Sequence, residues 1–150
     1  MSVEHENKAL VRRFWEAQDN CDLETIDELL APDFVDHDPL PGQESGREGF
    51  IKGIAEDCAA HSPVRTTIEY QATDGDLVIS RGTSRTVHDR GDYLGLKAPT
   101  GQESEHKAIA IHRIAGARSS RSGVLAALLR CWSLSRRRCK SASASRRSLR

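Results

Sequence analysis

The chain has no acidic residue after Glu105, although 22 of its 150 residues are Asp or Glu. Ten of its 22 Lys and Arg residues lie beyond Gly116, in a segment that therefore carries a net charge of +10. The residues up to Gly116 hold the other 12 basic side chains against all 22 acidic ones, a net charge of −10. This asymmetry indicates a binding arm or a tail of different origin.

Long apolar runs are also missing, and the N-terminus is acidic. We therefore expect no membrane span and no signal peptide, with the cytoplasm as the default location. No C-x-x-C pair occurs among the four cysteines, Cys21, Cys58, Cys131 and Cys139. Because the chain is long enough to bury an ordinary core, we expect no disulfide framework. Because none of the familiar ligand spacings occurs, we expect no zinc site.

Hydrophobic periodicity predicts three helices in the first 62 residues. Asp22 is placed to cap the second, and Pro32 ends it because proline cannot continue a helix. Ser45 and Glu48 form a capping box before the third. The helical spacing of apolar residues covers Val3–Gln18, Leu23–Leu30 and Phe50–Cys58.

After Ser62 and Pro63 the hydrophobic period changes from helical to two, which predicts strands. Asp74-Gly75 is a hairpin turn between the first two strands. The expected strands are Val64–Ala72, Leu77–His88 and Glu103–Ala115. Helices followed by an antiparallel meander predict an α+β fold, in which N-terminal helices cover one face of a curved, cone-shaped antiparallel sheet. The mouth of such a cone can hold a ligand.

Six stretches follow one another in a specific order: Leu10–Trp15, Leu23–His37, Gly46–Phe50, Tyr93–Leu96, Pro99–Gly101 and Ala110–Ile114. Together they resemble the SnoaL-like polyketide and ester cyclases of the nuclear transport factor two-like superfamily. The resemblance implies an enclosed apolar pocket, a homodimer, and neither a metal nor an organic cofactor. It implies acid/base chemistry on a small apolar ester or ketone, such as intramolecular aldol cyclisation. A non-catalytic small-ligand binder on the same fold is the alternative.

Aldol cyclisation needs a base near an acidic C–H and a donor for the developing oxyanion. His37 follows two apolar residues into the barrel region and is one catalytic candidate, with Asp36 beside it as a substrate-binding candidate. A solvated loop is the alternative for this segment.

His112 is the second catalytic candidate. It shares one face of the third strand with His106, Ala108 and Ala110, and the small residues leave room for a ligand. The resemblance aligns the family's histidine with Ala110, so His112 is its substitute on the same face. His106 is a substrate-binding candidate. The sequence leaves open whether this face or the face with Ile109 lines the pocket.

Two further residues are candidates for substrate binding. Arg81 lies amid apolar residues of the second strand and can bind a carboxylate or an enolate, with pairing to a surface Asp or Glu as the alternative. Trp15 belongs either to the core or to the pocket wall.

The tail departs from the family pattern after Ile114. Relatives continue with a strand close to Lys-Ile-Val-Glu-Glu-Trp, and its codons read out of frame give Ala-Arg-Ser-Ser-Arg-Ser, which stands at Ala117–Ser122. We therefore expect a SnoaL-like domain over residues 1–116 and a basic, out-of-frame or disordered tail over 117–150. Such a chain lacks the last strand and the family's main aspartate, so we expect weak stability and little or no activity.

Taken at face value, the tail offers a basic amphipathic helix that binds an anionic membrane or RNA. Its apolar face comprises Val124, Leu125, Leu128, Leu129 and Trp132, and Arg136–Arg138 follow. Unless the tail is genuine, we expect no nucleic acid or membrane partner.

Overall fold

The computed structural model describes residues 2–95, 97, 100–116 and 124–133. Within them, helices precede a sheet, which confirms the predicted α+β class. The elements are α1 (Val3–Asp19), α2 (Leu23–Leu29), β1 (Leu30–Asp36), α3 (Gly46–Ala60), β2 (Arg65–Asp74), β3 (Leu77–His88), β4 (Gln102–Ala115) and β5 (Val124–Ser133). None of the described helices is long and apolar enough to cross a membrane.

The predicted helix boundaries hold closely. Asp22 caps α2, since its Oδ1 accepts a hydrogen bond from the Thr25 amide at 3.0 Å. Ser45 stands at the N-cap of α3 but makes no side-chain capping bond, so the predicted capping box is not formed. Residues 30–36, which the sequence pattern divides between a helix end and an extended stretch, form the single strand β1.

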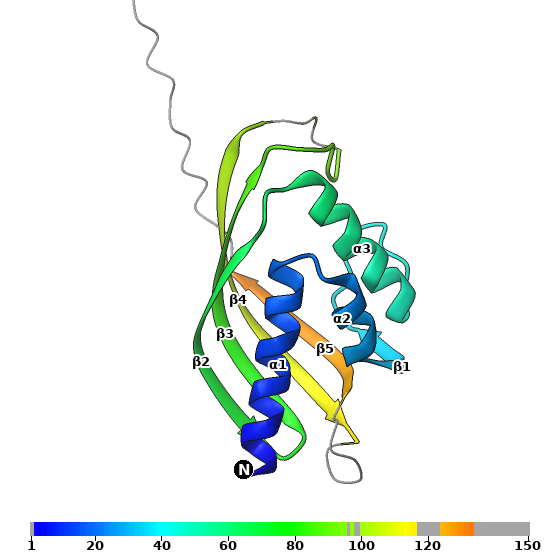
Figure 1. The fold of residues 1–150 in the computed structure, drawn as a ribbon, viewed down its shortest axis with the longest axis vertical. Helices are drawn as coiled ribbons and strands as arrows, with labels where there is room; N and C mark the ends of the chain where they lie inside the picture. The colour runs from blue at the N-terminus through cyan, green and yellow to red at the C-terminus, as the bar shows by residue number, and fades with distance from the viewer. Residues whose placement is uncertain (1, 96, 98–99, 117–123, 134–150) are drawn as a thin grey trace, which may run out of the picture.

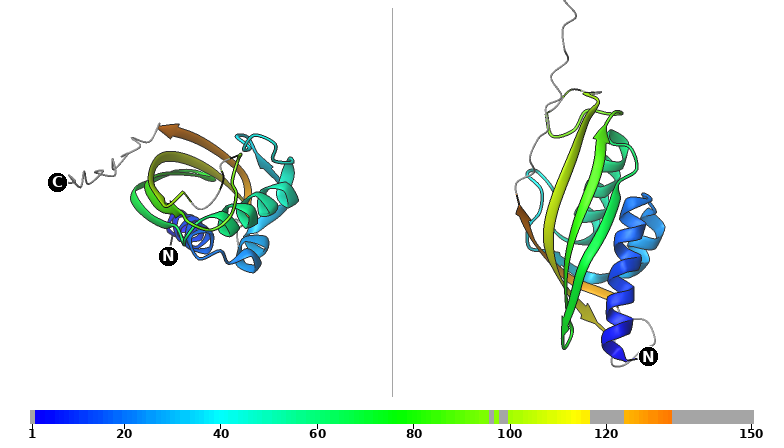
Figure 2. Two further views of the ribbon diagram at one scale, coloured as in Figure 1. Left: turned by 90° about the horizontal axis from the view of Figure 1, so that it is seen from above. Right: turned by 90° about the vertical axis from the view of Figure 1, so that its left-hand side faces the viewer.

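The five strands form one curved sheet in the order β1-β5-β4-β3-β2. Strand β1 runs parallel to β5, and the other neighbours are antiparallel. The helices lie on the concave side of this sheet, with α1 along its length (Figure 1). Seen from above, the strands curve round and the helices cover the open side (Figure 2).

The expectation that the sheet lacks its last strand is wrong. Val124–Ser133 pairs along β4 and also receives β1, so residues beyond Gly116 belong to the sheet. The helical alternative for this segment is wrong for the same reason. The edge of β4 offers unpaired backbone groups that a neighbouring strand satisfies, and Leu125 and Leu128 bury their side chains there. The expected frame change at Ala117–Ser122 and the basic cluster Arg136–Arg138 lie outside the described residues.

The core lies between the concave face of the sheet and the helices. Three phenylalanines meet in it, with ring centroids 6.0 Å apart for Phe14 and Phe50 and 5.2 Å apart for Phe34 and Phe50. Burying such rings is the largest favourable contribution that single side chains make to folding. The other buried apolar residues in the same cluster include Val11, Ile26, Leu29, Val78, Ala110, Ile114, Leu125 and Leu128.

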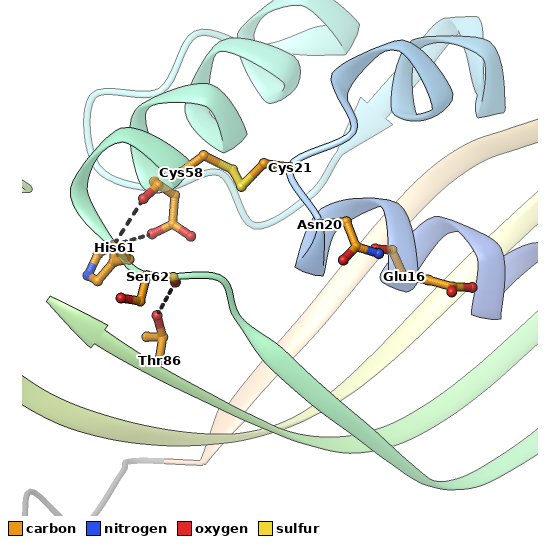
Figure 3. The surroundings of a disulfide bond; sticks show 8 residues. Glu16, Asn20, Cys21, Cys58, His61, Ser62 and Thr86 are labelled. Carbon is orange, nitrogen blue, oxygen red and sulfur yellow. Dashed lines mark hydrogen bonds and ion pairs between the residues drawn. A yellow bond between two sulfur atoms is a disulfide. The ribbon is translucent and has the colours of Figure 1, made fainter. Parts of the chain in front are cut away.

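A disulfide joins Cys21, in the turn between α1 and α2, to Cys58 near the end of α3. The sequence analysis expected no disulfide framework, so this single bridge, between residues 37 positions apart, was not predicted. The fold brings them together by packing α3 beside the α1–α2 turn (Figure 3). The disulfide therefore fixes the last turn of α3 to the end of α1.

Candidate functional site

A cavity of about 450 Å³ opens between the helices and the concave face of the sheet. Most of the sheet lining comes from alternate residues of two strands, Gly82, Ser84 and Thr86 on β3 and His106, Ala108, Ala110 and His112 on β4, and Thr66 of β2 and Leu128 of β5 add to it. This decides the question that the sequence left open, since the face with the two histidines lines the cavity. Helix residues such as Phe14, Trp15, Phe50, Ile54 and Asp57, with His61 at the end of α3, supply much of the opposite wall.

His112 lies at the buried end of the cavity and has 0% of its surface exposed. The indole Nε1 of Trp15 donates a hydrogen bond to its Nε2 over 3.3 Å. The ring of Phe14 packs edge-on against His112, with centroids 5.9 Å apart. Because an indole N–H can only donate, Nε2 of His112 is an acceptor here and the ring is neutral with its proton on Nδ1.

Trp15 reaches His112 because β3 has a glycine where the indole crosses it. A Cβ at position 82 would lie 2.5 Å from Cζ3 of Trp15 and 3.0 Å from the backbone oxygen of Thr67. Only glycine permits so close an approach. Gly82 thus sets the position of the indole, and the indole sets the hydrogen bond to His112.

The exposed end of the cavity is formed by Asp57 and His61 at the end of α3 and by His106 on β4. Nδ1 of His61 lies 3.0 Å from Oδ1 of Asp57 and 3.1 Å from the backbone oxygen of the same residue. Tyr93 packs edge-on against the His61 ring at a centroid distance of 4.7 Å. The positions of Asp57, His61 and His106 are therefore set by the end of α3, by β4 and by the loop that carries Tyr93.

Two titratable groups of the cavity wall have perturbed pKa values. Burial lowers the pKa of His106; the nearby Asp57 opposes this shift and His61 adds to it. Burial raises the pKa of Asp19, although the hydrogen bonds that Thr66 donates to its carboxylate act in the opposite direction. The amide and the hydroxyl of Thr66 lie 2.6 Å and 2.7 Å from the two carboxylate oxygens. Both shifts favour the neutral form of the group, as expected where water is partly excluded.

Comparison with known proteins identifies the family. The model of the SnoaL-like domain matches residues 11–121. The chain belongs to the SnoaL-like family. No curated protein matches its sequence. Among solved structures, the SnoaL-like fold is shared with TsrD from Streptomyces laurentii, at a TM-score of 0.71 and 22% identity over 85% of this chain and 88% of TsrD.

Two further solved structures show the same fold. IdmH from Streptomyces antibioticus, which is assigned as a polyketide cyclase, has a TM-score of 0.68 and 24% identity over 84% of this chain and 91% of IdmH. An LEH-like epoxide hydrolase from M. tuberculosis has a TM-score of 0.65 and 14% identity over 88% of this chain and 86% of the hydrolase. Likenesses at this level of identity establish the fold of the SnoaL-like chain and leave its reaction open.

In this SnoaL-like chain, His37 does not lie with His112. It is exposed and is not a lining residue of the cavity. Its amide donates to the backbone oxygen of Leu128 at 2.9 Å, so it continues the pairing of β1 with β5. Strand alternation then turns Asp36 inward and His37 outward, so His37 takes the solvated position that was its alternative.

Asp36 is buried but stands behind the cavity wall. Its Oδ2 accepts a hydrogen bond from Nε2 of Gln43 at 3.3 Å, and Gln43 lines the cavity. Its Oδ1 accepts from the amide of Asp38 at 3.1 Å. Asp36 therefore orients a lining residue and does not face the cavity itself.

Arg81 lies on the face of β3 opposite to the cavity. It forms an ion pair with Glu69, whose other carboxylate oxygen accepts from the Thr83 hydroxyl at 2.6 Å. The surface pairing given above as the alternative for Arg81 is thus the observed one. Trp15, His106 and His112 do line the cavity as predicted.

Asp57 and His61 were not predicted from the sequence. Their spacing of four residues places both on one side of a helix, which was the available signal. The predicted apolar stripe of this helix ends at Cys58, and it does not include Asp57 or His61. Among the described residues, no three His, Cys, Asp or Glu side chains gather closely enough to hold a metal ion.

Proposed function

We propose that the protein is a SnoaL-like cyclase that acts by acid/base chemistry on a small apolar ester or ketone and closes a ring by an intramolecular aldol reaction. One observation carries this proposal. A neutral histidine, His112, meets an N–H donor, Trp15, at the buried end of an otherwise largely apolar cavity. An aldol reaction needs these two functions, a base and an oxyanion donor, in a site with little water.

The proposed reaction begins with an exchange of hydrogen bonds. The carbonyl oxygen of the substrate takes the Trp15 N–H in place of His112, which leaves the Nε2 lone pair of His112 available as a base. Nε2 removes the proton from the carbon next to this carbonyl, and the indole N–H stabilises the enolate oxygen. The enolate carbon then bonds to a second carbonyl of the same substrate. The imidazolium returns its proton to the new alkoxide, so that the enzyme is restored.

The lining of the cavity supports an uncharged substrate. Among the described lining residues there is no Lys or Arg, and the carboxylates of Asp19 and Asp57 supply the only formal charges apart from the histidines. An anionic substrate would lose its hydration without gaining a cationic partner, which is costly. Ala108 and Ala110 leave space beside His112 for the substrate carbons.

The test is the exchange of the acidic protons of a β-keto ester with deuterated solvent, followed by NMR. General-base catalysis contributes on the order of 10²- to 10⁴-fold, so His112→Gln is expected to reduce exchange by about that factor. Trp15→Phe removes one oxyanion donor and is expected to cost about 10²- to 10³-fold.

His37→Gln is the matched control, because His37 is an exposed histidine outside the cavity and the change is expected to leave exchange unchanged. Equal losses in His37→Gln and His112→Gln would contradict the proposed roles. Tight binding of apolar ligands with no exchange in the wild-type protein would favour the non-catalytic ligand binder.

A further inference from the structure

The Asp57–His61 pair has the geometry of a general-base dyad that the proposed cyclisation does not use. A carboxylate bound to Nδ1 of a histidine fixes the ring and its tautomer, and it stabilises the imidazolium that forms when Nε2 takes a proton. Nδ1 of His61 hydrogen-bonds to the backbone oxygen of Asp57 at 3.1 Å, and the carboxylate Oδ1 of the same residue lies 3.0 Å from that nitrogen. Because both of these oxygens only accept, Nδ1 carries a proton, and the neutral ring then has its lone pair on Nε2.

Nε2 of His61 is available for chemistry. No hydrogen bond joins it to any of the residues that the structure describes. The ring lines the cavity, and the side chains of His61 and Asp57 are 11% and 33% exposed, so water reaches this end. Edge contact with Tyr93 and a tilted contact with His88, at a centroid distance of 5.1 Å, hold the ring in place.

The dyad stands apart from the His112–Trp15 pair. His106, which lies near Asp57 and His61, precedes His112 by six residues on β4. At roughly 3.3 Å per residue, the Cα atoms of the two β4 histidines are about 20 Å apart. A single small substrate therefore does not bring both centres to the same reacting bond.

We propose that Asp57 and His61 activate water at the exposed end of the cavity and give the protein a hydrolytic activity toward small apolar esters. His61 Nε2 removes a proton from water while the water oxygen bonds to the acyl carbon of the ester. The tetrahedral adduct collapses with cleavage of the acyl C–O bond. The imidazolium donates its proton to the departing alkoxide, so the products are a carboxylic acid and an alcohol.

Apolar residues next to the dyad supply a place for the acyl chain. Ile54 lies one turn before Asp57 on α3, and Val64 and Leu94 line the same cavity. Because these side chains cannot hydrogen-bond, they select for an alkyl ester without a charged group. Asp57 is a positioning residue in this scheme, since it acts on the ester only through His61.

The test measures hydrolysis of p-nitrophenyl butyrate by the full chain. We expect turnover above the buffer rate, slowed about two- to threefold in deuterated water because a proton moves in the rate-limiting step. His61→Gln is expected to reduce kcat by about 10²-fold or more. Asp57→Asn is expected to reduce kcat by about 10- to 100-fold with KM unchanged, because it loosens the ring without altering the acyl site.

His5→Gln is the matched control, since His5 is an exposed histidine on the first turn of α1. His112→Gln separates the two proposals, because it is expected to reduce exchange of the β-keto ester by about 10²- to 10⁴-fold and to reduce ester hydrolysis far less. Hydrolysis that equals the buffer rate, survives in His61→Gln, or shows no solvent isotope effect overturns the dyad. Should His61→Gln fail to fold, kcat of Asp57→Asn replaces it as the deciding measurement, and an unchanged kcat there overturns the dyad.

Discussion

At the buried end of the cavity, the rings of Phe14 and Trp15 surround His112, and its surroundings are part of the hydrophobic core. At the exposed end, His61 takes its position from Asp57 on the last turn of a helix, and a disulfide one residue away ties that helix to α1. The first histidine is thus oriented within the core, by aromatic packing and the Trp15 hydrogen bond. The second is oriented by Asp57 on a cross-linked helix end. Changes to packing and changes to the cross-link should therefore affect the two ends differently.

Reduction of the Cys21–Cys58 disulfide is expected to have the largest effect. A cross-link between residues 37 positions apart restricts the unfolded chain, and such a link contributes about 3–4 kcal/mol to the free energy of unfolding. Urea unfolding with and without dithiothreitol measures this loss.

The Cys21→Ser/Cys58→Ser double variant is the control, because it should show the same loss and no further response to reductant. Since Cys58 adjoins Asp57, we also expect ester hydrolysis to fall more than β-keto ester exchange. A reduced protein as stable as the oxidised one, or a larger loss of exchange, would contradict the comparison of the two ends.

The disulfide and β5 are two features of the fold that were not predicted from the sequence. The period-two pattern predicted β2, β3 and β4 within a few residues, because alternation is a local property of each strand. Strand β5 depends on the unpaired edge of β4, which is a property of the sheet. Likewise, Cys21 and Cys58 meet only because α3 packs beside the α1–α2 turn. Whether the coding frame changes at Ala117–Ser122 stays a prediction, and sequencing the DNA across those codons tests it.

Gly82→Ala is expected to have the next largest effect, at the buried end. The added Cβ would lie 2.5 Å from Trp15 and 3.0 Å from a backbone oxygen, so the indole must move away from His112. Overpacking of this kind costs about 1–3 kcal/mol. We expect that loss in thermal unfolding, together with a loss of β-keto ester exchange.

Gly53→Ala is the matched control, because Gly53 also lines the cavity but lies on α3. Its Cβ would approach the end of a flexible side chain, Oε1 of Gln43, at 3.3 Å. Alanine is the better helix former by about 1 kcal/mol, so stability should rise or stay constant. Equal destabilisation by both substitutions would mean that Gly82 does not set the position of the Trp15 indole.

The candidate site, like the fold, could be predicted only where it depends on local sequence pattern. His106 and His112 are an even number of residues apart on β4 and were correctly predicted to lie on one face, because strand alternation is a local property. For His37 the sequence left a cavity position and a solvated position open, and the exposed position is the observed one, because the direction of the alternation on β1 is set by its pairing with β5. Asp57 and His61 become cavity residues only because the sheet faces this end of α3. The helical pattern of the sequence does not predict that arrangement.

The smallest expected effect concerns His106 and the pH dependence of stability. Burial keeps the pKa of His106 below its ordinary value of 6.5, so the unfolded chain binds a proton at a pH where the folded chain does not. The stability contributed by the neutral form is complete above pH 6.5 and is lost as the pH falls through the lower pKa of the folded state. His106→Gln removes this group, while the neighbouring Asp57 and His61 are present in both proteins. The difference between the two unfolding curves should therefore change below pH 6.5, with the wild-type protein losing more stability, by less than the Gly82 substitution costs. If both proteins lose stability equally as the pH falls, His106 is hydrated in the folded protein. The buried part of the cavity then ends before His106 on β4.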